Sequence, residues 1–297
     1  MIRSSSINFI EDDDFMEQKE NSKKTKFKRS SFCNCFANLK VHPFRSLIFS
    51  QNLSEKVFLS YLMSVYRQLQ FFNQNIASVE IKASNINIVL PKLKSANLKT
   101  LFLDLNETIG YFSDPEEFDS KDLKPGDNAN IRPYFMDFLQ KLKPFYEIYT
   151  FSNLSADQTQ SIFDSLDPNQ EIINGFLTRD HCLITKDEIT IKPLVLIKNR
   201  EIEKMVIVTS SIQCCYFNLE NGIPIKPWKN DQQDRELKYL ANYLIEAYNE
   251  KDIRDYNIKT LKLKKLMSLT EDDIKKWFSK FKSFSNEEVK EKHSTMI

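Results

Sequence analysis

The sequence predicts a three-layer α/β domain, in which a parallel sheet lies between helices, with helical additions at both ends. Two observations support this fold class. Between residues 98 and 209, short apolar runs alternate with helical stretches, which is the pattern of βα units joined into a parallel sheet. The chain has 297 residues and is 41% hydrophobic, so it can bury one sizeable core and still leave residues for extensions.

A polar arm and an amphipathic helix precede this domain. Residues 1–50 combine an acidic cluster (11–14) with a basic one (23–29) and show no periodicity, so we expect this arm to be disordered. Within residues 51–90, apolar residues recur at spacings of four and three, at Phe58, Leu62, Val65, Leu69 and Phe72. This spacing predicts a helix over about residues 54–74 that packs on its own domain, followed by a linker.

Residues 91–250 form the predicted α/β domain. Strands are expected over residues 98–104, 146–151 and 204–209. Helices are expected over residues 132–143, 155–166 and 234–248. Residues 251–297 form a basic helical tail, in which we expect Thr270 and Asp273 to cap a short helix. That helix is expected to pack on the domain or to bind a partner.

Composition excludes several classes of function. The 42 basic and 41 acidic side chains nearly cancel, so nucleic acid is not expected as a direct partner. The five cysteines have no framework spacing, which indicates a reducing intracellular compartment, nucleus or cytoplasm. No run approaches the roughly 18 apolar residues of a membrane span. The first ten residues run into an acidic cluster, which argues against a signal or transit peptide and makes a mitochondrial location less favoured.

Polar side chains follow the predicted strands where each strand ends. Ligands bind at the carboxyl ends of strands in an open parallel sheet. The candidate site residues are Asp104, Asn106 and Thr108 after the first strand, Thr150 and Ser152 at the end of the second, Lys192 before the last, and Thr209 and Ser210 at the end of the last. An aspartate can attack phosphorus to form an acyl-phosphate, hydroxyl groups can bind phosphoryl oxygens, and a lysine can neutralise them. The set therefore suits a phosphoryl group.

The order of these segments resembles the small C-terminal-domain phosphatases, also called NLI-interacting-factor-like phosphatases, of the haloacid dehalogenase superfamily. The matching segments are LFLDLNET, RPYFMDFLQKL, YEIYTFSN, TRDHC, ITIKPL, KNREIEKMVIVTSS and NGIPIKPW, within roughly residues 90–250. The resemblance implies a haloacid dehalogenase-like, Rossmann-like domain. It also implies a Mg²⁺-dependent protein serine/threonine phosphatase that works through an aspartyl-phosphate.

The resemblance also implies roles for single residues. The first motif of the family reads Asp-x-Asp-x-Thr, in which the first aspartate is the nucleophile and the second is a general acid and base. Asp104 matches the nucleophile and Thr108 the closing threonine. Thr150 matches the phosphate-binding hydroxyl of the second motif, with Ser152 beside it, and Lys192 matches the phosphate-binding lysine. The spacing from this lysine to the next strand end is one residue longer than in the family.

Two departures from the family pattern concern the chemistry. Asn106 occupies the acid and base position, and an amide cannot take up and return a proton, a loss that typically costs about 10²–10⁴ in rate. Thr209 stands where the family has the aspartate that holds Mg²⁺, and a hydroxyl is a poor ligand for a hard cation that prefers carboxylates. Asp104 is left as the main charged metal ligand, so Mg²⁺ binding is expected to be weak or absent. The acid-rich connection between Thr108 and Arg132 would also disfavour an anionic peptide.

These departures lead to a functional hypothesis with two alternatives. The sequence predicts a pseudophosphatase, a non-catalytic or severely impaired relative that works as a binding or scaffold protein. The first alternative is a slow Mg²⁺-dependent phosphatase of phosphoserine or phosphothreonine proteins, in which Asn106 and a positioned water suffice. The second is a subunit of a larger assembly held by the terminal helices, since a related phosphatase-like domain serves in mitochondrial protein import. All of these roles require protein partners.

Simpler interpretations of single residues remain open. Asp104 alone also suits a strand-end turn. Thr150 and Ser152 also suit capping of the helix that follows them, because a cap uses the same backbone amides that bind phosphate. Lys192 alone also suits a solvated lysine of a hairpin.

Overall fold

The computed structural model describes residues 42–50, 53–75, 86–112, 131–185 and 188–276. All of them belong to the unit formed by residues 33–297. Most of the arm that we expect to be disordered, the acid-rich connection at 113–130 and the last residues of the tail lie outside the described residues.

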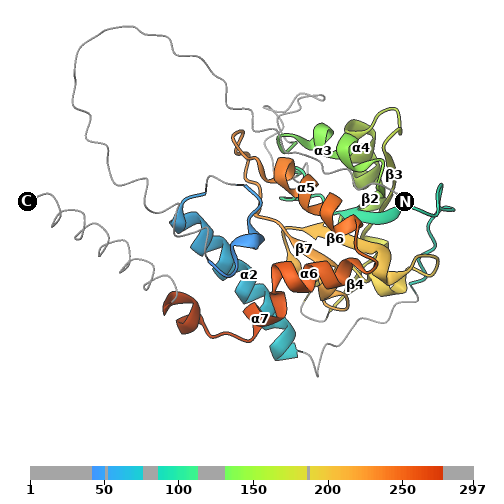
Figure 1. Ribbon diagram of the computed structural model, residues 1–297. Helices are drawn as coiled ribbons and strands as arrows, with labels where there is room; N and C mark the ends of the chain where they lie inside the picture. Colours follow the sequence, from blue (N-terminus) through green and yellow to red (C-terminus); the bar gives the residue numbers. More distant parts are fainter. Residues whose placement is uncertain (1–41, 51–52, 76–85, 113–130, 186–187, 277–297) are drawn as a thin grey trace, which may run out of the picture. The chain divides into compact units, whose positions relative to one another are not determined.

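A five-stranded parallel sheet is the centre of the described structure (Figure 1). Its strands are β1 (Lys99–Leu103), β2 (Tyr146–Phe151), β3 (Ile173–Leu177), β6 (Met205–Thr209) and β7 (Gly222–Pro224). Their order across the sheet is β3-β2-β1-β6-β7, and each neighbouring pair is parallel. Every residue of β1, β2 and β6 is buried, which explains why these strands are rich in apolar residues.

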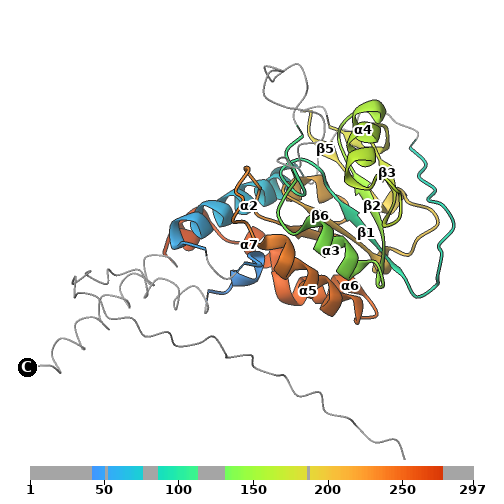
Figure 2. The ribbon, with the colours of Figure 1, turned by 90° about the horizontal axis from the view of Figure 1, so that it is seen from above.

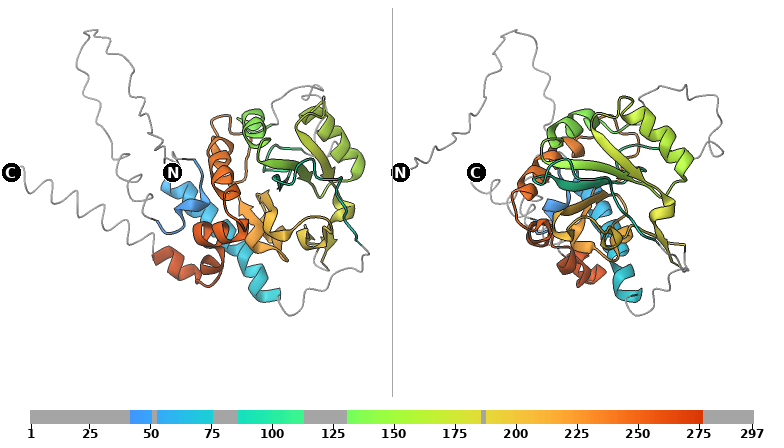
Figure 3. Two further views of the ribbon diagram at one scale, coloured as in Figure 1. Left: turned by 45° about the vertical axis from the view of Figure 1, so that its right-hand side comes forward. Right: turned by 90° about the vertical axis from the view of Figure 1, so that its right-hand side faces the viewer.

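Helices flank the sheet, and the predicted α/β architecture is confirmed. The helices are α2 (Glu55–Asn75), α3 (Phe135–Leu142), α4 (Ala156–Leu166), α5 (Glu236–Tyr248), α6 (Ile253–Leu261) and α7 (Leu263–Met267). The connections β1–α3–β2 and β2–α4–β3 step the same way across the sheet, and right-handed connections of this kind put α3 and α4 on one face. Helix α3 packs on α5 (Figure 3).

Both helical additions pack on the domain over the described residues. The five apolar residues that predict α2 are all buried, and α2 lies beside α7 (Figure 2). Beyond residue 250, Ile253, Leu261 and Ile274 belong to the same hydrophobic cluster as the sheet. The predicted cap is present, because the Thr270 hydroxyl accepts a hydrogen bond from the Asp273 N–H at 3.1 Å and Asp273 Oδ2 accepts one from the Thr270 N–H at 3.0 Å.

The sequence analysis did not predict the two edge strands. Strand β3 is interrupted by Asn174 and Gly175 and therefore lacks an apolar run. Gly175 has a φ of 153°, and a Cβ atom at this position would lie 3.2 Å from the ring of Tyr149. Glycine therefore allows β3 to approach the β2 side chains closely. Strand β7 has three residues and ends at Pro224, so it is too short to be recognised by periodicity.

A buried ion pair joins the loops that flank the candidate site. Arg132 donates to both carboxylate oxygens of Asp234 at 2.9 Å, and both side chains are 0% exposed. Arg132 also donates to the carbonyl oxygens of Thr108 and Lys226, each at 2.9 Å. Burial acts to raise the pKa of Asp234, but the hydrogen bonds and charges of Arg132 and Lys226 outweigh it and hold the pKa below its ordinary value of 3.8.

We predict that Asp234→Asn lowers the free energy of unfolding at neutral pH by about 3–5 kcal/mol, because it leaves the buried Arg132 without its counter-charge. The folded-state pKa of Asp234 lies below its unfolded value, so the contribution of this carboxylate is complete above pH 3.8 and is lost as the pH falls through the folded-state pKa. The difference between variant and wild type should therefore shrink in acid.

Urea unfolding at neutral and acidic pH measures both effects. Glu201→Gln is the matched control, because Glu201 pairs with Lys204 at the surface, where an ion pair is worth about 0–1 kcal/mol. A loss at Asp234 as small as that of the control would contradict the prediction.

Candidate functional site

Three of the predicted site residues meet directly at the carboxyl ends of β1 and β6. Asp104 follows β1 and is 7% exposed. Its Oδ1 atom pairs with Lys192 Nζ and accepts a hydrogen bond from the Leu105 N–H at 2.9 Å. Its Oδ2 atom accepts a hydrogen bond from the Thr209 hydroxyl at 2.7 Å. Groups of the chain itself therefore bond both carboxylate oxygens.

Lys192 reaches Asp104 from the end of a short hairpin made of β4 (Leu183–Ile184) and β5 (Thr190–Ile191). Its backbone N–H donates to the carbonyl oxygen of Cys214 at 2.8 Å, and its side chain is 3% exposed. Burial acts to lower the pKa of Lys192, but the charge of Asp104 and the hydrogen bond to it outweigh burial and raise the pKa above its ordinary value of 10.5. Lys192 is thus a buried cation, and the interpretation as a solvated lysine does not fit.

Thr108, Asn106 and Ser210 form a second group of contacts beside the first. The Thr108 hydroxyl is buried and accepts a hydrogen bond from the Ser210 N–H at 2.9 Å. The Ser210 hydroxyl donates to the carbonyl oxygen of Asn106 at 3.3 Å. The side-chain oxygen of Asn106 accepts a hydrogen bond from the Phe112 N–H at 3.0 Å. These contacts hold the loop after β1 against the end of β6.

Thr150 and Ser152 lie at the end of β2, the strand beside β1. The register pairs Thr150 with Leu103, one residue before Asp104, and the Thr150 hydroxyl is buried without a hydrogen-bond partner among the described residues. The Ser152 hydroxyl accepts a hydrogen bond from the Leu154 N–H at 2.9 Å. Neither residue caps α4, because Ser155 is its N-cap. The structure therefore keeps an unused hydroxyl group, that of Thr150, on the strand next to Asp104.

Buried cysteines lie beside the site. Cys182, Cys214 and Cys215 are all buried, and the Cys214 thiol donates to the Thr209 hydroxyl at 3.6 Å. Burial raises the pKa of Cys182 to about 12. The signal that would have indicated Cys214 is its place five residues after the strand end at Thr209.

The donor set around Asp104 does not fit a Mg²⁺ ion. Mg²⁺ prefers carboxylate and water oxygens in near-octahedral geometry. Both oxygens of Asp104 already accept bonds, and the Thr209 hydroxyl donates its hydrogen toward Asp104. Among the residues that the structure describes, no three or more His, Cys, Asp or Glu side chains are grouped so that they could hold a metal ion.

An aspartate, a lysine and hydroxyl groups at the carboxyl edge of a parallel sheet are groups that can bind a phosphoryl group. Residues 99–254 match the family model described as NLI interacting factor-like phosphatase, and the chain belongs to that family. The resemblance seen in the sequence is thereby confirmed.

Three relatives illustrate this family. The chain is 30% identical over 188 residues to CTD small phosphatase-like protein 2 of Dictyostelium discoideum, which covers 60% of this chain and 32% of the relative. It is 34% identical over 125 residues to the mitochondrial import inner membrane translocase subunit TIM50 of Yarrowia lipolytica, covering 41% of this chain and 26% of the relative. The solved structure of Fcp1, an essential RNA polymerase II CTD phosphatase, is similar with a TM-score of 0.35 and 17% identity, covering 54% of this chain and 52% of that chain. The chain thus spans from 26% to 52% of the length of these proteins.

We predict that Asp104 and Lys192 are energetically coupled. In a double-mutant cycle of Asp104→Asn and Lys192→Met, each variant is expected to lose unfolding free energy. The sum of the two single losses should exceed the loss of the double variant by about 0.5–3 kcal/mol, because each single change leaves a buried charge or amide without its partner. Urea unfolding of the four proteins measures the coupling.

The control cycle replaces Lys192→Met by Lys198→Met. Lys198 is exposed, so its cycle with Asp104→Asn should show additive losses. Additive losses in the Lys192 cycle as well would contradict the ion pair.

Proposed function

We propose that this protein is a phosphatase-fold binding or scaffold protein that does not turn over phosphate esters efficiently. The bonding of Asp104 is the observation that carries the proposal. A carboxylate oxygen that attacks phosphorus must turn a lone pair toward it, and at Asp104 both oxygens are held by protein partners, Oδ1 by Lys192 and Oδ2 by Thr209. Lys192, which would neutralise phosphoryl oxygens, is committed to the same carboxylate.

Asn106 supports the loss of acid and base chemistry. Its amide has no proton-accepting capacity in the ordinary pH range. Its Oδ1 atom is used to fix the backbone at Phe112, which gives the residue a structural task. Loss of general acid and base help typically costs about 10²–10⁴ in rate.

Thr209 supports the loss of the metal. The Thr209 hydroxyl carries no charge and donates its hydrogen to Asp104, so it is a poor ligand for a cation that prefers carboxylates. We therefore expect Mg²⁺ to bind weakly or not at all. Where a metal ion is present it neutralises charge between an attacking group and a phosphoryl group. On this proposal the positive charge of Lys192 balances the negative charge of Asp104, so the buried carboxylate does not need the ion.

The names of the relatives, which include both enzymes and a subunit of an assembly, support a role in binding. The similar proteins include phosphatases and the TIM50 subunit of a translocase, so the fold occurs in proteins named as enzymes and in a protein named as part of an assembly. We propose that this protein binds other proteins in the same general way, as a scaffold or as a subunit, in the nucleus or cytoplasm. In the described part of the chain, we find no helix with the length and apolar character that crossing a membrane requires.

We predict negligible hydrolysis of a phosphoserine peptide and of an aryl phosphate at millimolar Mg²⁺, compared with an active family member assayed in parallel. Release of inorganic phosphate is the measurement. Asp104→Asn is the control, because activity that survives this change comes from a contaminating phosphatase. A wild-type rate within about tenfold of the active relative, lost in Asp104→Asn, would overturn the proposal and favour the slow enzyme.

The double variant Asn106→Asp with Thr209→Asp extends the same assay. If the two substitutions account for the loss of turnover, restoring both carboxylates should raise the rate by at least about 10²-fold over wild type. Thr209→Ser, which keeps the hydroxyl, is the matched control and should leave the rate unchanged.

A further inference from the structure

Cys214 and Cys215 form a pair of buried thiols next to the candidate site. Both belong to the 3-10 helix η6 (Ile212–Cys215). Their Sγ atoms are 3.8 Å apart, and both cysteines are free and buried. Two thiols at this separation are in van der Waals contact. Because the two residues are neighbours in the chain, closing a bond between them requires both side chains to rotate and the backbone between them to adjust.

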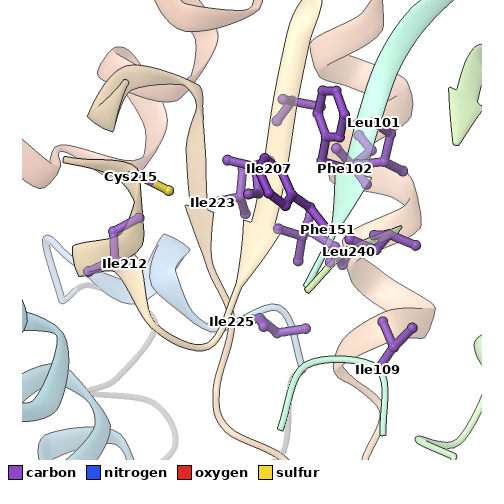
Figure 4. Packing of buried hydrophobic residues seen from close by; sticks show 14 of the residues in the cluster. Leu101, Phe102, Ile109, Phe151, Ile207, Ile212, Cys215, Ile223, Ile225 and Leu240 are labelled. Atoms are coloured by element: carbon purple, nitrogen blue, oxygen red, sulfur yellow. The ribbon is translucent and has the colours of Figure 1, made fainter. Parts of the chain in front are cut away.

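The packing of η6 keeps the two sulfur atoms together. Cys215 lies against the backbone of β7, where a Cβ atom added at Gly222 would come within 2.9 Å of its Sγ atom and within 2.7 Å of Ile212 Cδ1. Figure 4 shows Ile212 and Cys215 on η6, beside the strand that carries Ile223. The glycine therefore makes room for Cys215 at the position where it meets Cys214.

Cys214 contacts both groups that hold Asp104. Its thiol donates to the Thr209 hydroxyl at 3.6 Å, and its carbonyl oxygen accepts a hydrogen bond from the Lys192 N–H at 2.8 Å. Thr209 and Lys192 each bond one oxygen of Asp104. A covalent change at Cys214 is thus only one contact away from each partner of the carboxylate.

We propose that Cys214 and Cys215 are a thiol modification site, which a peroxide oxidises to a disulfide between the two neighbouring residues and a dithiol reduces again. The oxidation changes how Lys192 and Thr209 hold Asp104. This inference concerns the chemistry of the thiols and stands whether or not the site turns over a phosphate ester.

The reaction balances with a peroxide as the oxidant. The Cys214 sulfur attacks one peroxide oxygen, the O–O bond breaks, and the products are a sulfenic acid and one water. The Cys215 sulfur then attacks the Cys214 sulfur, so that the S–S bond forms, the S–O bond breaks and a second water leaves. The two thiols lose two electrons and two protons, and the peroxide takes up both.

The disulfide alters the site for two physical reasons. An oxidised sulfur carries no hydrogen, so Thr209 loses the thiol that donates to its hydroxyl oxygen. Drawing the two sulfurs to bonding distance also moves the backbone at Cys214, whose carbonyl positions Lys192. Cys182 is a natural comparison, because its thiol donates to the carbonyl oxygens of Ser152 and Thr178.

The test treats the folded full-length chain with hydrogen peroxide, alkylates the remaining thiols and digests the protein with trypsin. We expect the peptide of residues 205–229 to lose the mass of two hydrogens and to escape alkylation, and dithiothreitol to reverse both changes. Cys182→Ser should behave as wild type, whereas Cys214→Ser and Cys215→Ser should each lose the reversible product. Oxidation of Cys214 to a sulfinic acid, a disulfide between chains, or no reaction while free glutathione is oxidised would overturn the proposal.

A second measurement tests the coupling to the site. The coupling energy between Asp104 and Lys192 is measured by the double-mutant cycle of Asp104→Asn and Lys192→Met, in the reduced protein and after peroxide treatment. We expect the coupling energy to fall in the oxidised protein and to return after reduction, and to be unaffected by peroxide when all four proteins also carry Cys215→Ser. An equal coupling energy in reduced and oxidised protein would overturn the link between the thiols and Asp104.

Discussion

The ion pair between Asp104 and Lys192 is the interaction on which the candidate site depends. It joins the end of β1 to the β4–β5 hairpin, and Thr209 ties the same carboxylate to β6. A carboxylate this buried must be paired, because an isolated charge in the protein interior is costly. Lys192 and the Thr209 hydroxyl supply these contacts. The geometry of the site therefore follows from how the chain neutralises one aspartate.

Two residues that the sequence resemblance implies to be departures from the family's motifs have structural tasks in this arrangement. Asn106 fixes the backbone at Phe112, and Thr209 donates to Asp104. A carboxylate at position 209 would face Asp104 at close range and would need a cation between the two, since like charges disfavour one another's ionised form. A threonine at position 209 is thus consistent with a site that is held together by contacts within the protein. On our proposal, the fold is retained for binding.

The sequence predicted the interior of the sheet better than its edges or its contacts. Strands β1, β2 and β6 are recognisable because they are buried on both faces, whereas Gly175 and Pro224 interrupt the edge strands. Asp104, Thr108 and Lys192 were candidates because they lie next to predicted strands, and the family resemblance then gave them roles. The contact between Asp104 and Thr209 joins residues 105 positions apart, and it depends on the register that pairs Leu103 with Val208. Because β1 and β6 are buried at every residue and lack a polar and apolar alternation, their sequences do not show this register. The sequence does not show the role of Cys214 either.

The most direct test of this account is a calorimetric titration of the wild-type protein and of Thr209→Asp with Mg²⁺ at millimolar concentrations. The account predicts no saturable binding to the wild type, because both Asp104 oxygens are bonded within the chain, and measurable binding to the variant with a second carboxylate. Saturable binding to the wild type that Asp104→Asn abolishes would contradict the account. Asp104 would then be a metal ligand, and its bonds to Lys192 and Thr209 would not exclude the ion.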